Sequence, residues 1–592
     1  MQIERMVIEK NQILLHTPGG MRTYPSEIAG SGLFRDLLLR FIGELKAEDS
    51  LIAEAIGEDF KSEQGLKRFI EMIVRLQRNT LGDVAKLVVG GETYLAPGKR
   101  QALHRFVEAF YDYWRRFDRY VILHASPGPI SHEHRPYRAF NATVDAFGEV
   151  IRGLYRDLCE NITGDHPRVY RQVASGANVG LIAVPKTLRL PSPYRDALEG
   201  IPLIRQVLIN PPLILDPPVN KRSGDFVRVA ENPLAFMPLD KQSYLCYPVQ
   251  VGPLCILVYF HQRFISLACS MANLFELANE EQLSRAPDAV FVYGAPKEVH
   301  ERLGMGANIF YDDEAKGLVA GFIPLDENCG YFGYVKKMVL TLHNVVMMKR
   351  GRMPFHGAMT RLHLHNRQSA TLLLIGDTAT GKSETLEALR LLGKSEIRDI
   401  MVIADDMGSL AVGDGGRVVG YGTETGAFIR LDDLQQGYAF NQIGRAIIMS
   451  PHRTNARVVL PVTTLEEILR GCEVDFLLYA NNYEAVDQAH PILERFATAE
   501  DALAVFERGT SMSKGTTTSS GLVSNYFANI FGPPQYKPQH DALARRTFEA
   551  AFASGAYVGQ LRTRLGLPGF EQEGPKAASE ALLKLIKEKK TP

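Results

Sequence analysis

Two hydrophobic periods dominate the first part of the chain. Residues 1–15 alternate between apolar and polar positions, a period of two that predicts β-strand. From about residue 31 to 125, the apolar positions recur at steps of three and four, which is the period of an amphipathic helix. This pattern predicts helices over 34–48, 65–79 and 102–123. We therefore expect a mainly helical N-terminal part.

The pattern changes after two clusters of proline. One further helix is predicted from about Phe140 to Asn161, and the prolines within 185–193 and 211–218 then indicate a domain boundary. Beyond them, short apolar runs alternate with helical segments, which is typical of an α/β domain. The predicted strands are CILVYF (255–260), AVFVYG (289–294), AMTRLHLH (358–365), TLLLIG (371–376) and MVIADD (401–406), and the predicted helices lie at 334–350, 383–393 and 576–590.

Composition and charge narrow the class of protein. The chain has 592 residues, of which 45% are hydrophobic, and this length predicts two to four domains. Lys plus Arg and Asp plus Glu each number 67, and this zero formal charge argues against a protein that coats nucleic acid or an acidic membrane. The six cysteines show no C-x-x-C spacing, and the N-terminus lacks the apolar core of a signal peptide. We therefore expect a soluble, cytoplasmic protein with no nucleic-acid or membrane partner.

A phosphate-binding motif joins one predicted strand to the next predicted helix. The segment GDTATGKS fits G-x-x-x-x-G-K-S at every position. It consists of Gly376, Asp377, Thr378, Ala379, Thr380, Gly381, Lys382 and Ser383. The glycines permit a tight turn of inward-facing amides, Lys382 supplies a positive charge for the outer phosphates, and the Ser383 hydroxyl can bind Mg²⁺. The motif therefore predicts binding of a nucleoside triphosphate.

A pair of carboxylates follows about two dozen residues later. Asp405 and Asp406 end the apolar run MVIADD, and adjacent carboxylates at a strand end can bind a hard cation and orient a nucleophile. The alternative is a turn or a helix cap, in which aspartate is common. The position of the pair after a phosphate motif favours the metal interpretation.

The residues around these motifs resemble two known families. GKSETLEAL (381–389) resembles HPr kinase, in which a phosphate loop is followed by a pair of aspartates. A longer stretch, roughly 215–534, resembles the ATP-type phosphoenolpyruvate carboxykinases. The matching elements are GYFGYVKKM (330–338), PFHGAMTRL (354–362), IADDMG (403–408), TNARVVLP (454–461) and SKGTTTSSGLVSNYFANIFGP (513–533).

The carboxykinase resemblance implies a metal site. It places Lys337, His356 and Asp406 on the family's metal ligands, with Ser383 of the phosphate motif as a further ligand, and it places Tyr331 in the substrate site. Two nitrogens and one oxygen with open water positions suit Mn²⁺ better than Ca²⁺. The implied cofactors are ATP, Mg²⁺ and Mn²⁺.

The same resemblance implies residues for catalysis. Lys336 matches the lysine beside the metal ligand, Asp405 lies beside the metal-binding aspartate, and Arg457 matches an arginine that bridges phosphates. With Lys382 they form the expected catalytic set. Each residue also has a purely structural alternative. The two lysines could lie on the solvated edge of a helix, and His356 could lie in a loop. Arg457 could form a surface ion pair, and Tyr331 could belong to the core. Their joint match to one pattern favours the site.

The sequence also departs from the carboxykinase pattern. The lid arginine of the family is replaced by Thr518, so a phosphate contact is lost or comes from elsewhere, with Lys514 as a candidate. The nearest counterpart of the family's carboxylate-binding arginine is Arg222 in NKRSGD, and the glutamate of the family's G-E-M-K-K stretch is Tyr334.

These observations lead to one expected organisation with alternative functions. The expected fold is α/β, with a carboxykinase-like two-lobed core of mixed sheets and a phosphate loop. Residues 1–205 form a mainly helical N-terminal extension, 206–352 an N-lobe-like α/β domain, and 353–592 the nucleotide- and metal-binding catalytic domain with a lid near 510–522. The leading function is conversion of oxaloacetate and ATP to phosphoenolpyruvate, CO₂ and ADP. The alternatives are a kinase acting on a protein serine or a small hydroxyl compound, with Asp405 or Asp406 as general base, and a nucleotide-binding regulator without turnover.

Overall fold

The computed structural model gives an α/β protein with mixed sheets, divided into two compact units. It describes residues 5–9, 11–17, 24–47, 50–124, 136–164, 176–392, 396–431, 443–514 and 520–588. Unit 1 contains residues 1–184 and 204–210, and unit 2 contains 185–203 and 211–592. None of the described helices combines the length and the apolar composition that a bilayer-spanning segment needs.

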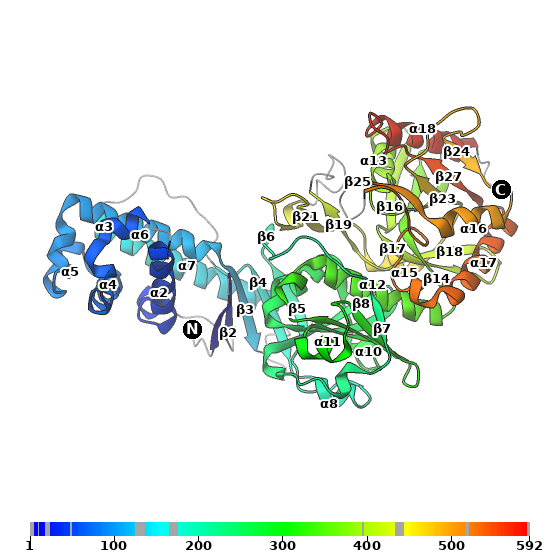
Figure 1. Ribbon diagram of the computed structural model, residues 1–592. Helices are drawn as coiled ribbons and strands as arrows, with labels where there is room; N and C mark the ends of the chain where they lie inside the picture. Colours follow the sequence, from blue (N-terminus) through cyan, green and yellow to red (C-terminus); the bar gives the residue numbers. More distant parts are fainter. Residues whose placement is uncertain are drawn as a thin grey trace. The chain divides into compact units, whose positions relative to one another are not determined.

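Unit 1 combines helices with a small sheet (Figure 1). Its helices are α1 (Pro25–Ala29), α2 (Gly32–Ala47), α3 (Leu51–Ile56), α4 (Glu63–Leu76), α5 (Leu81–Leu87), α6 (Pro97–Arg116) and α7 (Pro136–Thr163). Its strands follow the order β1 (Arg5–Glu9), β2 (Gln12–Thr17), β3 (Asp118–His124), β4 (Val179–Val184) and β5 (Leu203–Ile209). The alternating N-terminal residues form the hairpin β1–β2, as their pattern predicts.

The helix predicted over 102–123 is too long. Helix α6 ends at Arg116, and the last apolar residues of the stretch form strand β3 instead. Strand β3 pairs in parallel with β2 and β4, and Tyr120–Leu123 are fully buried. A strand that is buried on both faces has no alternation, so periodicity alone cannot separate it from a buried helix.

The first sheet of unit 2 is mixed. Strands β9, β11 and β13 run parallel, while β8 and β12 flank them in the antiparallel sense. The strands follow the order β8 (Tyr244–Val251), β9 (Leu254–His261), β11 (Ala289–Ala295), β13 (Leu318–Pro324), β12 (Ile309–Asp313) and β7 (Val227–Val229), with β10 (Glu276–Leu277) beside β8. Helices α8 (Tyr194–Leu198), α9 (Ile265–Cys269), α10 (Glu280–Leu283) and α11 (Lys297–Leu303) belong to the same part of the chain.

The second sheet of unit 2 is built around the long strand β14 (Met353–Leu364). It follows the order β22 (Cys472–Glu473), β18 (Val418–Gly422), β17 (Met407–Val412), β14, β15 (Ser369–Ile375), β23 (Phe476–Asn481), β27 (Tyr557–Arg562) and β24 (Leu493–Arg495), and β16 (Ile397–Ala404) also pairs with β14. Strands β15, β23 and β27 are parallel, so their carboxyl ends meet at one edge. In open α/β sheets, that edge is where ligands bind.

Helices cover this second sheet. Leu389 of α13 (Lys382–Leu392) and Leu582 of α18 (Glu573–Glu588) share one buried cluster with Leu372 and Leu478 of the sheet. Figure 1 shows α13 and α18 beside each other. The remaining helices of this part are α15 (Leu465–Arg470), α16 (Ala499–Arg508) and α17 (Lys537–Ala553). The predicted tail helix is therefore present and amphipathic.

Two smaller β-structures complete unit 2. A four-stranded sheet has the order β19 (Gly426–Arg430), β21 (Arg457–Pro461), β20 (Ile447–Met449) and β6 (Leu213–Leu215). Strands β25 (Thr510–Lys514) and β26 (Ser520–Ser524) form an antiparallel hairpin.

Helix α12 (Phe332–Lys349) is buried along almost its whole circumference. A helix that is apolar on all sides belongs inside a core, and α12 contacts both β13 and β14. Its first turns nevertheless carry Lys336 and Lys337, and Lys336 is only 3% exposed. A buried ammonium requires a charged or hydrogen-bonding partner, so these lysines point to a polar cluster inside unit 2.

The buried ring of His540 on α17 makes the stability of unit 2 depend on pH. Its ring contacts the Tyr526 hydroxyl and the Pro354 carbonyl, and burial lowers the pKa of His540 to about 4, although the carbonyl opposes this shift. An unfolded histidine takes a proton below about pH 6.5, so this contribution to stability is present above that pH and lost on acidification toward pH 4. We expect His540→Gln to be less stable than the wild type at pH 7.5, and the gap in unfolding free energy to narrow by roughly 2 kcal/mol at pH 4.5. Urea denaturation of both proteins at the two pH values measures the gap, and a constant gap would contradict a neutral buried ring.

Candidate functional site

The Gly376–Ser383 segment lies at the carboxyl end of β15. β15 ends at Ile375 and α13 begins at Lys382, so the segment turns directly from a buried strand into a helix. Gly381 has a φ of 91°, and a Cβ there would lie 2.7 Å from Thr563. Glycine is therefore required at this position, because a side chain would meet both backbone strain and a close neighbour.

Lys382 folds back over its own segment. Its Nζ donates to the carbonyl oxygens of Gly376 at 2.6 Å and Asp377 at 2.8 Å. Burial lowers the pKa of Lys382, while the nearby carboxylates of Asp406 and Asp377 oppose the shift. The ammonium is thus held inside the turn by neutral carbonyls, which phosphate oxygens can replace.

Neighbouring strand ends support the segment from behind. The Asn482 amide donates to the carbonyl of Ala379 at 2.9 Å, and the Thr563 hydroxyl donates to that of Thr380 at 2.7 Å. These two residues directly follow β23 and β27, the parallel neighbours of β15. Asn482 also bonds to both backbone groups of Met512 in β25, so it joins the segment to the β25–β26 hairpin.

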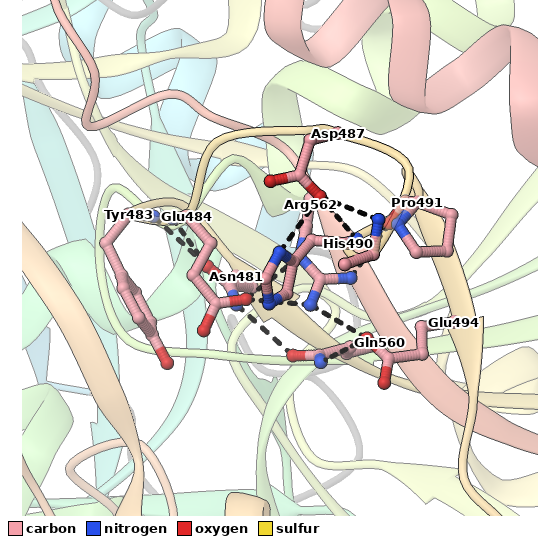
Figure 2. A network of polar contacts seen from close by, with 10 residues as sticks. Asn481, Tyr483, Glu484, Asp487, His490, Pro491, Glu494, Gln560 and Arg562 are labelled. Atoms are coloured by element: carbon pink, nitrogen blue, oxygen red, sulfur yellow. Dashed lines mark hydrogen bonds and ion pairs between the residues drawn. The ribbon is translucent and has the colours of Figure 1, made fainter.

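A buried arginine fixes the same strand ends. Arg562 Nε donates to Glu484 at 2.9 Å, Nη2 lies 2.7 Å from Glu494, and Nη1 donates to the Pro491 carbonyl at 2.8 Å. Gln560 donates to Glu494 and accepts from the Asn481 amide, which closes the network in Figure 2. The network holds the loop after β23 against the end of β27.

We expect Arg562→Met to destabilise unit 2 by about 2 to 3 kcal/mol. The substitution leaves two partly buried glutamates without their cation, and such a loss costs more than a surface ion pair contributes. The matched control is Arg417→Met, because the ion-pair partner of Arg417, Glu473, is 58% exposed. For this variant we expect a loss of stability of less than about 1 kcal/mol. Urea denaturation measures both, and equal losses would show that the buried network contributes no more than an exposed pair.

His356 and Asp406 form the centre of a polar cluster. β16 and β17 both pair with β14, and the turn between them carries Asp406 to the side of His356. His356 Nδ1 donates to the Ala528 carbonyl, and its Nε2 lies 3.0 Å from Asp406 Oδ1. This distance also fits two ligands of one cation, since adjacent ligands of an octahedral ion with bonds of about 2.1 Å are about 3.0 Å apart. The carbonyl on Nδ1 is the outer contact that usually orients a metal-binding histidine.

Lys336 neutralises the other side of Asp406. Its Nζ lies 2.8 Å from Asp406 Oδ2 and 3.4 Å from Glu424 Oε1. Burial opposes the charge on Lys336, but the two carboxylates outweigh it and raise the pKa of the ammonium. Burial would likewise raise the pKa of Asp406, yet Lys336 and His356 hold it well below its usual value. Asp406 is therefore an anion at neutral pH, as a metal ligand must be.

Glu424 is a site residue that the sequence analysis missed. Its side chain is fully buried, its described ion-pair partner is the Lys336 ammonium, and burial raises its pKa to about 8 although Lys336 opposes the rise. It lies in the run GTETG, in which a Cβ at either Gly422 or Gly426 would come within 1.9 Å of a backbone carbonyl. The glutamate between the two glycines of GTETG was the sequence signal that could have pointed to this residue.

Lys337 lies on the cavity side of α12. Its Nζ is 4.5 Å from the centre of the Phe531 ring, and burial, with help from Arg222, lowers the pKa of the amine to about 8. A lysine binds a metal only as the neutral amine, so this environment suits a ligand. Asp405 also lines the cavity, where burial raises its pKa to about 6, against the opposing charge of Lys336.

Arg457 and Tyr331 meet around one aromatic ring. The Arg457 guanidinium lies 5.5 Å and the Lys336 ammonium 5.8 Å from the centre of Phe428, and Tyr331 packs on the same ring at 6.0 Å. Burial raises the pKa of Tyr331, and the adjacent Arg457 opposes the rise. Phe428 is a second residue that the sequence analysis missed, and an aromatic residue in a short strand gave no specific signal.

One cavity of about 1030 Å³ brings most of these residues together. Thirteen of the sixteen predicted site residues line it, and so does the ring of Phe428. The predicted residues on its wall are Arg222, Tyr331, Lys336, Lys337, Asp377, Thr378, Ala379, Thr380, Lys382, Ser383, Asp405, Asp406 and Arg457. His356 contacts the wall residue Asp406 at 3.0 Å, and Gly376 and Gly381 lie in the turn itself. Arg222 stacks on Phe226 at 4.9 Å, and burial lowers its pKa.

The predicted lid corresponds in part to the β25–β26 hairpin. Ser511, Ser513 and Val523 of the hairpin line the cavity. Thr518 and the side chain of Lys514 lie outside the described residues, so the loss or replacement of the lid arginine stays a prediction.

Sequence comparisons add no relative to this picture. No protein-family model matches the chain, and no curated protein matches it.

Proposed function

We propose that unit 2 is a metal-dependent phosphotransferase that transfers a terminal phosphoryl group between a nucleoside triphosphate and a small anionic compound. One observation carries the proposal. Lys382 of the Gly376–Ser383 segment (the glycine-rich turn), Asp406 beside His356, and Arg457 all line a single cavity. Phosphoryl transfer needs little beyond positioning and neutralisation of charge, and these are the groups that provide both.

Each group has a defined task in this proposal. Lys382 and the amides of the Gly376–Ser383 turn bind the outer phosphates, and Arg457, which lines the same cavity, holds the transferred group. His356, Asp406, Lys337 and Ser383 would hold Mn²⁺ or Mg²⁺, which, when bound, neutralises phosphate charge and polarises the reacting oxygen. Arg222 and Tyr331 bind the carboxylate end of the acceptor.

The reaction favoured by the sequence resemblance is that of a carboxykinase. Oxaloacetate would lose CO₂, and the enolate oxygen left behind would attack the terminal phosphorus of ATP, releasing ADP and phosphoenolpyruvate. Lys336, whose pKa is raised by Asp406 and Glu424 against the effect of burial, remains a cation next to the developing enolate charge.

A kinase acting on a hydroxyl group is the second candidate. It is favoured by Asp405, which lines the cavity and has a pKa raised to about 6, mainly by burial. A carboxylate with that pKa accepts a hydroxyl proton more readily than an ordinary aspartate. The acceptor would be a protein serine or a small hydroxyl compound.

A coupled assay tests the first candidate. The full chain is incubated with oxaloacetate, ATP, Mn²⁺ and Mg²⁺, and phosphoenolpyruvate is detected as it forms. Turnover that disappears in Lys382→Ala supports the carboxykinase. The absence of turnover, with metal-dependent ATP binding retained, would exclude it and lead to transfer of labelled phosphate from ATP onto proteins and metabolites. If no acceptor is labelled, the remaining candidate function is that of a nucleotide-binding regulator without turnover.

A further inference from the structure

Helices α6 and α7 of unit 1 bring three different metal-binding side chains together. His104 and Glu108 lie four residues apart and therefore on the same face of α6, while Cys159 comes from α7. Their ligand atoms all lie within 4.8 Å of one another. This cluster belongs entirely to unit 1 and has no part in the proposed phosphotransferase site.

The distances agree with a tetrahedral ion. Glu108 Oε1 lies 3.7 Å from His104 Nε2 and 3.7 Å from Cys159 Sγ. In a tetrahedral zinc site with ordinary bond lengths, nitrogen and oxygen ligands are about 3.4 Å apart, and sulfur and oxygen ligands about 3.6 Å apart. Side-chain movements of a few tenths of an ångström would bring Glu108 to ligand distance from both partners, and His104 and Cys159 offer ligand atoms within 4.8 Å of each other.

The surroundings hold the ligands in place. The Tyr155 hydroxyl donates to Glu108 Oε1 at 2.6 Å, and the Tyr155 ring stacks on Tyr111 with ring centres 4.1 Å apart. Such outer hydrogen bonds orient the carboxylates of metal sites. The His104 and Glu108 side chains are 35% and 47% exposed, which leaves a path for an ion and room for a water ligand.

We propose that His104, Glu108 and Cys159 bind a thiophilic divalent cation, with Zn²⁺ as the ion and water in the fourth position. A set of one thiolate, one imidazole and one carboxylate is softer than any set that suits Mg²⁺ or Ca²⁺. The ion would join α6 to α7 and thereby stabilise unit 1.

Cobalt substitution tests this site in the full chain. The reduced, chelator-treated protein is titrated with Co²⁺, and the near-ultraviolet band that arises only from a thiolate–cobalt bond is followed. We expect one equivalent of cobalt to produce the band and Zn²⁺ to displace it. Cys159→Ser should abolish the band, His104→Gln should weaken binding at least tenfold, and the control Cys472→Ser should retain the band.

Two results would overturn the proposal. One is a wild-type protein that binds cobalt without a thiolate band, and the other is a band that survives in Cys159→Ser. The residues lining the unit 2 cavity include no cysteine, so cobalt bound there gives no such band. The outcome is therefore independent of whether unit 2 is a phosphotransferase. A circular dichroism spectrum of each variant checks that a lost band reflects a lost ligand and not unfolding.

Discussion

Replacing Lys382 with alanine should reduce phosphoryl transfer by about a hundredfold to a thousandfold, the cost of removing one preorganised charge-stabilising group. The Lys382 ammonium donates hydrogen bonds to the Gly376 and Asp377 carbonyls of the glycine-rich turn. Phosphate oxygens would take over these contacts and form charge-assisted hydrogen bonds. Nucleotide affinity should fall by roughly tenfold to a hundredfold, because a hydrogen bond to a charged group contributes about 1.5 to 3 kcal/mol.

The fold should tolerate this change. The described hydrogen bonds of Lys382 go to neutral carbonyls, and Asp406 keeps Lys336 as its cation when Lys382 is removed. The matched control is Lys584→Ala on α18, whose side chain is 79% exposed and which should behave as the wild type. Calorimetric titration with a non-hydrolysable ATP analogue measures the affinity. If the well-folded Lys382→Ala variant binds the analogue with wild-type affinity, the glycine-rich turn is not part of the nucleotide site.

Asp406→Asn should weaken Mn²⁺ binding by roughly a hundredfold or more. Changes to residues that only orient a metal ligand cost tenfold to a hundredfold in affinity, and Asp406 is expected to be a ligand itself. The amide removes the anion that faces His356 Nε2 at 3.0 Å, while Glu424 remains 3.4 Å from the Lys336 ammonium as its acidic partner. The loss of affinity should therefore come with little loss of stability.

The signal of free Mn²⁺ in electron paramagnetic resonance measures this binding directly. The control is Asp414→Asn, an exposed aspartate in the turn before β18, which should leave the affinity unchanged. His356→Ala should reproduce the Asp406→Asn result, since both residues belong to one pair. If Mn²⁺ affinity in Asp406→Asn equals that of the wild type, the cation site lies elsewhere in the cavity.

Local sequence determined much of the secondary structure that carries these residues. The run TLLLIG predicted strand β15, SETLEALRLLG predicted helix α13, and YVKKMVLTLHNVVMMKR predicted helix α12, and all three are present. These predictions succeed because apolar period and length are local properties of the chain. The same criterion was wrong for β3, whose apolar residues are buried on both faces by partners distant in sequence.

The sequence by itself determined which residue types stand at the strand ends and that the fold is α/β. Only the tertiary structure decided which of them meet: the register of β14 against β16 and β17 places His356 beside Asp406, and α12 brings Lys336 to both Asp406 and Glu424. The flanking glycines of GTETG were the one sequence signal for Glu424, and they did not indicate its burial, because a carboxylate in a turn is ordinarily solvated. Its burial, and with it the raised pKa of about 8, arises from packing between segments far apart along the chain.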